Sequence, residues 1–114
     1  MECNITARNI ELTSDIKKYI AKRLAKVERL YGRIYGCEVI LEEEKIRKNV
    51  EIIVYLKRNK IIAKESTGDI FSSIDNASES IKKQLGRLSD KLKSQRRRNI
   101  LGSITKPIKG FRGR

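Results

Sequence analysis

The apolar residues of this chain recur with two different periods, and the order in which the periods change constrains the fold. Apolar and polar residues alternate over four short stretches, as they do in half-buried β-strands. Two longer stretches repeat apolar residues every three or four positions, as amphipathic α-helices do. The order predicts β-α-β-β-β-α in one domain. The alternating stretches are residues 3–7, 37–42, 50–57 and 60–64.

Capping residues predict where the two helices begin and end. Thr13 fits a helix N-cap, and Asp15 follows in the first turn, where a negative charge is favoured. Gly32 is expected to end this helix, and Asp69 is a candidate N-cap for the second one. The expected buried faces are Ile16, Ile20, Leu24, Val27 and Tyr31 in the first helix, and Ile70, Ile74, Ala77, Ile81, Leu85, Leu88 and Leu92 in the second.

The predicted fold class is α+β, with a four-stranded mixed sheet and two helices packed on one face. The first helix must connect two parallel strands by a crossover, and the later strands are joined by hairpins as antiparallel neighbours. Residues 42–45 and the pair Arg58-Asn59 are the expected hairpin connections. Cys3 and Cys37 are expected to be neighbours on adjacent strands, where each thiol behaves as a small core hydrophobe.

The charge of the chain predicts a polyanionic partner. It carries 27 Lys and Arg against 14 Asp and Glu, a net charge of +13. Cations placed on phosphates release condensed counterions, which drives binding, whereas the alternative is a surface that only keeps the protein in solution. Residues 94–114 hold seven cations and no acid, together with Gly102 and Pro107. We therefore expect a domain at residues 1–93 and a basic tail at 94–114 that is disordered until bound.

The cations of the two helices are arranged in stripes. Between Thr13 and Arg33 there are seven cations and two acids, whereas an ordinary solvated helix mixes signs for pairing. This imbalance favours phosphate contacts, although a polar helix face is often only solvated. The stripes are Lys18, Lys22, Lys26, Arg29 and Arg33 in the first helix, and Lys83, Arg87 and Lys91 in the second.

Other function classes have little support in the sequence. The chain has no His and no Cys-x-x-Cys, so we expect no zinc site, no cofactor and no catalysis. No apolar run is long enough to span a bilayer, and no signal peptide is evident, so we expect a cytoplasmic protein with reduced thiols and no membrane partner. No aromatic pair lies on a strand, which favours recognition of RNA shape and backbone over base sequence.

Three segments, in order and spacing, resemble a known family. They are residues 4–13 (NITARNIELT), 21–29 (AKRLAKVER) and 69–75 (DIFSSID), extended by Lys83-Gln84-Leu85 and by residues 90–93. Together they resemble the short ribosome hibernation promoting factors and the related ribosome-associated translation inhibitor. The resemblance covers about residues 3–93.

The resemblance implies a protein that binds the rRNA of the small ribosomal subunit in stressed or stationary cells. It would block translation by occupying the channel for messenger and transfer RNA, with no covalent step, small-molecule substrate or cofactor. By residue type, the family's rRNA-facing positions fall on Arg23, Lys26, Lys83, Gln84, Arg87 and Lys91, to which the first stripe adds Lys22 and Arg29.

The sequence departs from the family at several positions and in its tail. Ser80 and Ser89 stand where relatives often carry a basic residue, and the basic tail replaces the acidic stretch or second domain of other members. The alternative is a general double-stranded RNA-binding or RNA-chaperone module. Such domains run α-β-β-β-α, so the first strand of this chain argues against it.

Overall fold

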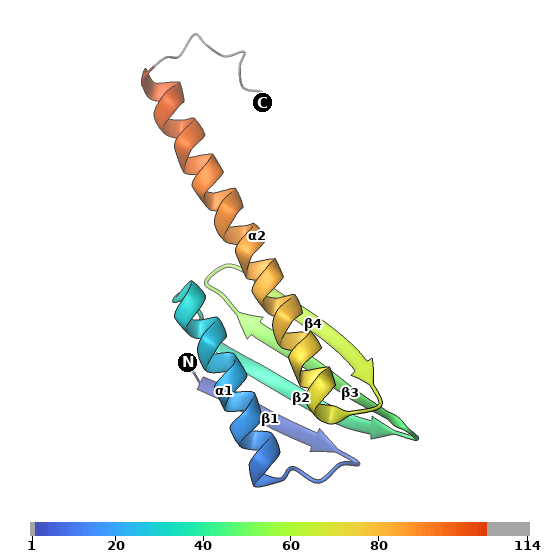
Figure 1. Cartoon of the computed structure of the whole chain (residues 1–114). Helices are drawn as coiled ribbons and strands as arrows, with labels where there is room; N and C mark the ends of the chain where they lie inside the picture. Colours follow the sequence, from blue (N-terminus) through green and yellow to red (C-terminus); the bar gives the residue numbers. More distant parts are fainter. Residues whose placement is uncertain (1, 105–114) are drawn as a thin grey trace.

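The computed structural model describes the backbone of residues 2–104 and the side chains of residues 2–88. Six elements follow the predicted order β-α-β-β-β-α (Figure 1). They are β1 (Glu2–Arg8), α1 (Ser14–Tyr31), β2 (Gly36–Glu44), β3 (Arg47–Tyr55), β4 (Lys60–Thr67) and α2 (Ile70–Ile104).

The strands form one mixed sheet in the order β1-β2-β3-β4. β1 pairs with β2 in parallel, and the two later pairings are antiparallel. Figure 1 shows α1 and α2 side by side on one face of the sheet, with α1 as the crossover from β1 to β2. The predicted fold class and the predicted coverage of a single face are therefore confirmed.

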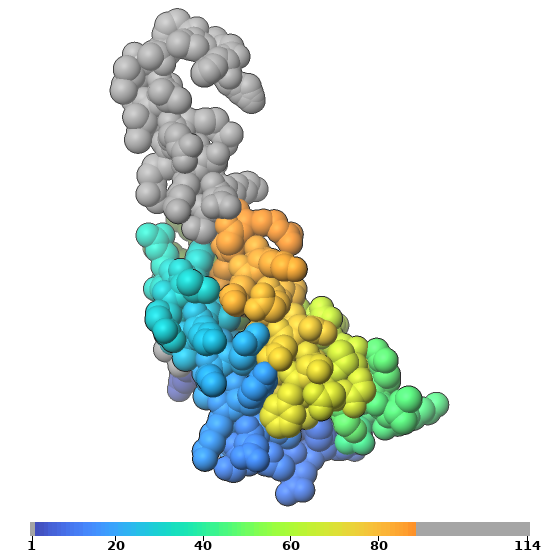
Figure 2. All heavy atoms as spheres, in the orientation of Figure 1, coloured from blue at the N-terminus to red at the C-terminus, as the bar shows by residue number. Residues whose placement is uncertain are grey.

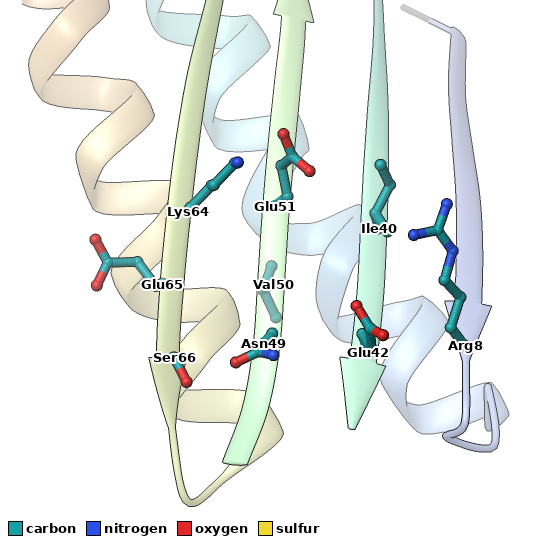
Figure 3. A pocket seen from close by; sticks show the side chains of 9 residues that line it. All are labelled: Arg8, Ile40, Glu42, Asn49, Val50, Glu51, Lys64, Glu65 and Ser66. Carbon is teal, nitrogen blue, oxygen red and sulfur yellow. The ribbon is translucent and has the colours of Figure 1, made fainter. Parts of the chain in front are cut away.

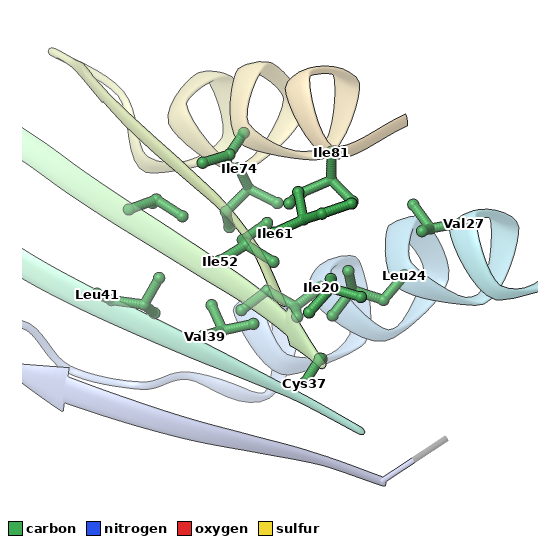
Figure 4. Close-up of a cluster of buried hydrophobic side chains, with 14 of the residues drawn as sticks. Ile20, Leu24, Val27, Cys37, Val39, Leu41, Ile52, Ile61, Ile74 and Ile81 are labelled. Carbon is green, nitrogen blue, oxygen red and sulfur yellow. The ribbon is translucent and has the colours of Figure 1, made fainter. Parts of the chain in front are cut away.

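Alternate residues of the strands and one stripe of each helix form the core between the two layers (Figure 4). Val39, Leu41 and Ile52 point from the sheet towards the helices and are almost fully buried. Each such side chain contributes about 1.5–3 kcal/mol through removal from water. The helices supply Ile16, Ile20, Leu24 and Val27 from α1, and Ile70, Ile74, Ala77, Ile81 and Leu85 from α2.

The predicted caps are confirmed. Thr13 Oγ1 accepts a hydrogen bond from the Ile16 amide at 3.2 Å, and Asp69 Oδ2 accepts one from the Ser72 amide at 2.9 Å. Gly32 ends α1 in the left-handed region, with φ 75°, and its amide bonds to the Glu28 carbonyl at 2.8 Å. These contacts satisfy backbone groups that the helix ends leave without intrahelical partners.

One hairpin differs from its prediction. Residues 42–44 were expected in a turn but belong to β2, which pairs with β3 as far as Glu44 and Arg47. Cross-strand contacts account for the longer strands, because Lys48 Nζ lies 2.8 Å from Glu43 Oε2 and Asn49 Nδ2 lies 2.7 Å from Glu44 Oε1. The connection shrinks to Lys45-Ile46. The hairpin at Arg58-Asn59 is confirmed.

α2 also differs from its prediction, because it continues to Ile104 instead of ending near residue 93. No Gly or Pro interrupts residues 89–101, so nothing in the sequence stops the helix there. Figure 1 shows the last part of α2 extending past the sheet and past the end of α1. The expected tail thus overlaps a helix over residues 94–104, and residues 105–114 lie outside the described part of the chain.

Candidate nucleic-acid interface

The outward face of α1 carries a row of exposed cations. Since Ile20, Leu24 and Val27 face the sheet, residues about half a turn away from them must face solvent. Lys22, Lys26 and Arg29 occupy this outward face. All three are exposed, and none pairs with a carboxylate of residues 2–88. Lys22, Lys26 and Arg29 of the predicted stripe therefore form a solvent-facing positive surface, whereas Arg33 lies beyond the end of α1.

Arg23 has a different role from the other predicted cations of α1. It lies at the junction with α2, where its Nε is 3.1 Å from Asp75 Oδ1 and its guanidinium is 3.5 Å from Glu79 Oε2. The Tyr19 hydroxyl donates to the same Asp75 oxygen at 2.6 Å, and Lys82 Nζ bonds to Glu79 Oε2 at 3.1 Å. We call these five residues the inter-helix network.

Charges within the inter-helix network oppose one another, so the junction between the helices adds little net charge. The hydrogen bond to Asp75 raises the pKa of the Tyr19 hydroxyl, with burial acting in the same direction. The hydrogen bond from Lys82 lowers the pKa of Glu79. Both shifts favour, at neutral pH, a protonated Tyr19 and an ionised Glu79, which are the forms that make these contacts. The network joins α1 to α2 and is a poor site for an added anion.

On α2, the predicted residues separate into two groups. Lys83 and Arg87 are exposed and face outward, since Ile81 and Leu85 of the same helix face the core. Gln84 instead turns towards β4, where its Nε2 donates to the Ile62 carbonyl at 3.1 Å. Lys91 lies on the helical backbone of α2, and its side chain lies outside the described residues.

The two helices thus present cations on the same side of the molecule. Figure 2 shows α1 and the described part of α2 next to each other on one face. α1 carries the larger excess of positive charge, with six cations and two acids, whereas residues 70–88 of α2 carry three cations and two acids. We call the outward-facing group Lys22, Lys26, Arg29, Lys83 and Arg87 the helix-face cations.

A second basic cluster was not predicted from the sequence. The β3–β4 hairpin lies close to the C-terminal end of α1, and together they line a hollow of about 600 Å³. Arg33, Lys57 and Arg58 line it with Tyr31 and Tyr35, and none of its lining residues is acidic. Lys57 and Arg58 are adjacent in the sequence, but only the fold brings them near Arg33. This cluster extends the positive surface beyond the helices.

The open face of the sheet has a different character (Figure 3). A shallow hollow of about 410 Å³ lies over the ends of the strands, and its wall mixes Arg8 and Lys64 with Glu42, Glu51 and Glu65. Mixed signs at this spacing favour cross-strand pairing over the binding of a polyanion. Within residues 2–88, no three His, Cys, Asp or Glu side chains are grouped so that they could hold a metal ion.

None of the helices in the described part of the chain combines the length and the apolar character that a membrane crossing requires.

Fold and surface together define a small basic α+β domain with a cationic helical face and an opposite sheet face of mixed charge. Comparison with known proteins then gives the family. Residues 3–93 match the model of the family described as sigma 54 modulation protein / S30EA ribosomal protein, and the chain belongs to this family.

Relatives of known name support the assignment and confirm the resemblance seen in the sequence. Proteins named ribosome hibernation promoting factor are 29% identical in Escherichia coli K12 and 30% identical in Salmonella typhimurium LT2, over 82% of this chain and 98% of each relative. The protein of that name from Pseudomonas putida KT2440 is 27% identical over 82% of this chain and 92% of its own length.

Solved structures show the same fold. The N-terminal domain of Thermus thermophilus Protein Y superposes with a TM-score of 0.71 at 28% identity, over 77% of this chain and 99% of that domain. A ribosomal subunit interface protein from Coxiella burnetii gives a TM-score of 0.75 at 19% identity, over 79% of this chain and 99% of the other. The second likeness bears on the fold alone.

Proposed function

We propose that this protein is a ribosome hibernation factor that binds the small ribosomal subunit and inhibits translation under stress or in stationary phase. Membership of the family and the names of the relatives support ribosome association. The single observation that carries the proposal for the site is the row of exposed helix-face cations, none of which forms an ion pair with a carboxylate among residues 2–88. Such a surface attracts a phosphate backbone whatever its base sequence.

The mechanism in this proposal is occupancy of the messenger and transfer RNA channel. The helix-face cations replace counterions along rRNA, and the folded domain then excludes the RNA ligands of translation from the same space. No bond is made or broken. Lys91 lies further along the backbone of α2, and the cluster of Arg33, Lys57 and Arg58 extends the positive surface around the end of α1.

Two residues of the candidate set receive narrower roles. Arg23 is held by Asp75 and Glu79, so we assign it to positioning α1 against α2 rather than to direct phosphate contact. Gln84 is held by the Ile62 carbonyl and has an amide oxygen left for an RNA hydroxyl. The direct electrostatic contacts are therefore proposed for Lys22, Lys26, Arg29, Lys83 and Arg87.

Co-sedimentation with purified ribosomal subunits tests this function. The protein should sediment with small subunits, and bound protein should decrease as initiator transfer RNA and messenger RNA are added, because the ligands share one space. Random double-stranded RNA of equal phosphate concentration is the matched competitor. Equal affinity for that duplex would replace the proposal with a general RNA-binding module, and simultaneous binding with the initiation ligands would exclude channel occupancy.

A further inference from the structure

Two thiols meet on the core side of the sheet, near the C-terminal end of α1. Cys3 in β1 and Cys37 in β2 are register partners in the parallel pairing. Their Sγ atoms lie 2.6 Å apart, with the Cys37 thiol donating to Cys3. Both are free cysteines: Cys37 is buried beneath the helices (Figure 4), and Cys3 on the edge strand is partly exposed.

The backbone geometry suits a bond between these two sulfur atoms. Neighbouring strands lie about 4.7–4.9 Å apart, and disulfides join Cα atoms separated by about 4.4–6.8 Å. Register partners on adjacent strands therefore already satisfy the backbone requirement. The two sulfur atoms are closer than a van der Waals contact, so only small side-chain rotations separate the dithiol from a bond of about 2.05 Å.

We propose that Cys3 and Cys37 form a reversible disulfide that joins β1 to β2, with a low-molecular-weight disulfide such as glutathione disulfide as the oxidant. The Cys3 thiolate attacks one sulfur of glutathione disulfide, so a mixed disulfide forms and one glutathione leaves as its thiolate, which takes up a proton. Cys37 then loses its proton and displaces the second glutathione from Cys3. The protein loses two electrons and two protons, and the oxidant yields two glutathione thiols.

The order of attack follows from exposure and from the hydrogen bond between the thiols. Cys3 is the sulfur that a solute can reach from the edge of the sheet. The hydrogen bond from Cys37 lowers the pKa of Cys3, against the effect of burial, which favours the thiolate nucleophile. The same hydrogen bond and burial raise the pKa of Cys37, so this thiol acts second, within the mixed disulfide.

Oxidation would close a covalent loop around the βαβ unit. The 33 residues between the two cysteines include all of α1, and β1 is an edge strand held by only one neighbouring strand. Constraining a loop of this length in the unfolded chain should raise Tm by about 10 °C. This inference does not depend on the proposed ribosomal function.

The test is an oxidation of the full chain with glutathione disulfide, followed by denaturation, alkylation and intact-mass measurement. The expected product lacks two hydrogens, takes up no alkylating reagent, has the raised Tm, and returns to the dithiol on treatment with dithiothreitol. A wild-type product that still alkylates at both cysteines, or that carries glutathione without losing it to Cys37, would overturn the proposal.

Two variants separate the roles of the cysteines. Cys37→Ala should accumulate the mixed disulfide at Cys3, and Cys3→Ser should gain little glutathione because the remaining thiol is buried. Thermal unfolding of both reduced variants verifies that they are folded. Because Cys3 is only partly buried, Cys3→Ser keeps the comparison valid if Cys37→Ala fails to fold. Rapid glutathionylation of folded Cys3→Ser would contradict the assigned order of attack.

Discussion

Two buried serines of α2 show how far a residue's role depends on its partners. Ser73 Oγ donates to the Lys48 carbonyl at 2.7 Å and accepts from the Thr67 amide at 3.0 Å, so it joins α2 to two strands. Within the described residues, the one hydrogen bond of Ser78 Oγ goes to the Ile74 carbonyl of its own helix, at 2.8 Å. Both lie in a stripe of apolar residues, and the sequence cannot distinguish them because the partners of Ser73 come from other elements.

Alanine substitution should separate these two serines. Ser73→Ala removes the side-chain partner of a half-buried carbonyl and a half-buried amide and should lower the free energy of unfolding by about 2 kcal/mol. Ser78→Ala is the matched control, and it should change that free energy by less than about 0.5 kcal/mol, because a helical hydroxyl bonded to its own turn adds little. Urea denaturation of both variants measures the difference. Equal effects would show that the Ser73 contacts do not join α2 to the sheet.

Tyr19 provides a pH-dependent measure of the inter-helix network. Its pKa is raised above the ordinary value by Asp75, so its contribution to stability is complete below about pH 10 and is lost as the pH rises through the folded-state pKa. Tyr19→Phe removes this hydrogen bond and should cost about 1 kcal/mol at pH 8.

The measurement is the free energy of unfolding of wild type and Tyr19→Phe from pH 7 to 11. The difference between them should stay constant up to about pH 10 and shrink above it. Since both proteins carry the same lysines, the titration of those side chains largely cancels in the difference. A gap that widens above pH 10 would mean that the tyrosinate is favoured at this position and would contradict the assigned network.

At the scale of the elements, the sequence predicts well which helices and strands form and in what order. It predicts poorly the residues at which they end. Hydrophobic period identified all four strands and both helices, and the caps at Thr13, Gly32 and Asp69 are where local chemistry predicts them. Residues 42–44 resemble a turn because they are three successive acids, and only their partners on β3 make them strand residues. Residues 94–104 resemble a tail because of their charge, although they contain few helix breakers.

Alanine substitution should have opposite effects on stability at two glycines, one that caps α1 and one inside α2. Gly32 has φ 75°, so Gly32→Ala should destabilise the protein by about 1 kcal/mol, even though the space around its Cβ position is open. Gly86 lies inside α2 with open space around it, and Gly86→Ala should stabilise by about 0.5–1 kcal/mol. Thermal unfolding measures both. A loss of stability in Gly86→Ala would show that α2 is not a regular helix at this position.

At the scale of the whole molecule, the topology could be predicted because few arrangements satisfy a parallel crossover followed by two hairpins. The candidate site was predicted only in part. Periodicity identifies the outward face of α1, but it cannot show that Arg23 pairs with Asp75 or that Gln84 turns to Ile62. Arg33 was expected in the stripe of the first helix, but its grouping with Lys57 and Arg58 was missed, because it depends on contacts between distant segments.

The most direct test of the central claim measures how tightly a triple variant binds small ribosomal subunits across a salt series. The variant is Lys22→Gln/Lys26→Gln/Arg29→Gln. Its control, Lys45→Gln/Lys60→Gln/Lys64→Gln, removes the same charge from exposed residues of the β2–β3 turn and the open sheet face. The helix variant should bind more weakly, and its log–log salt slope should be smaller by about 2–3. The control should keep the wild-type slope. Equal affinity and equal slope for the two variants would contradict binding through the helix-face cations.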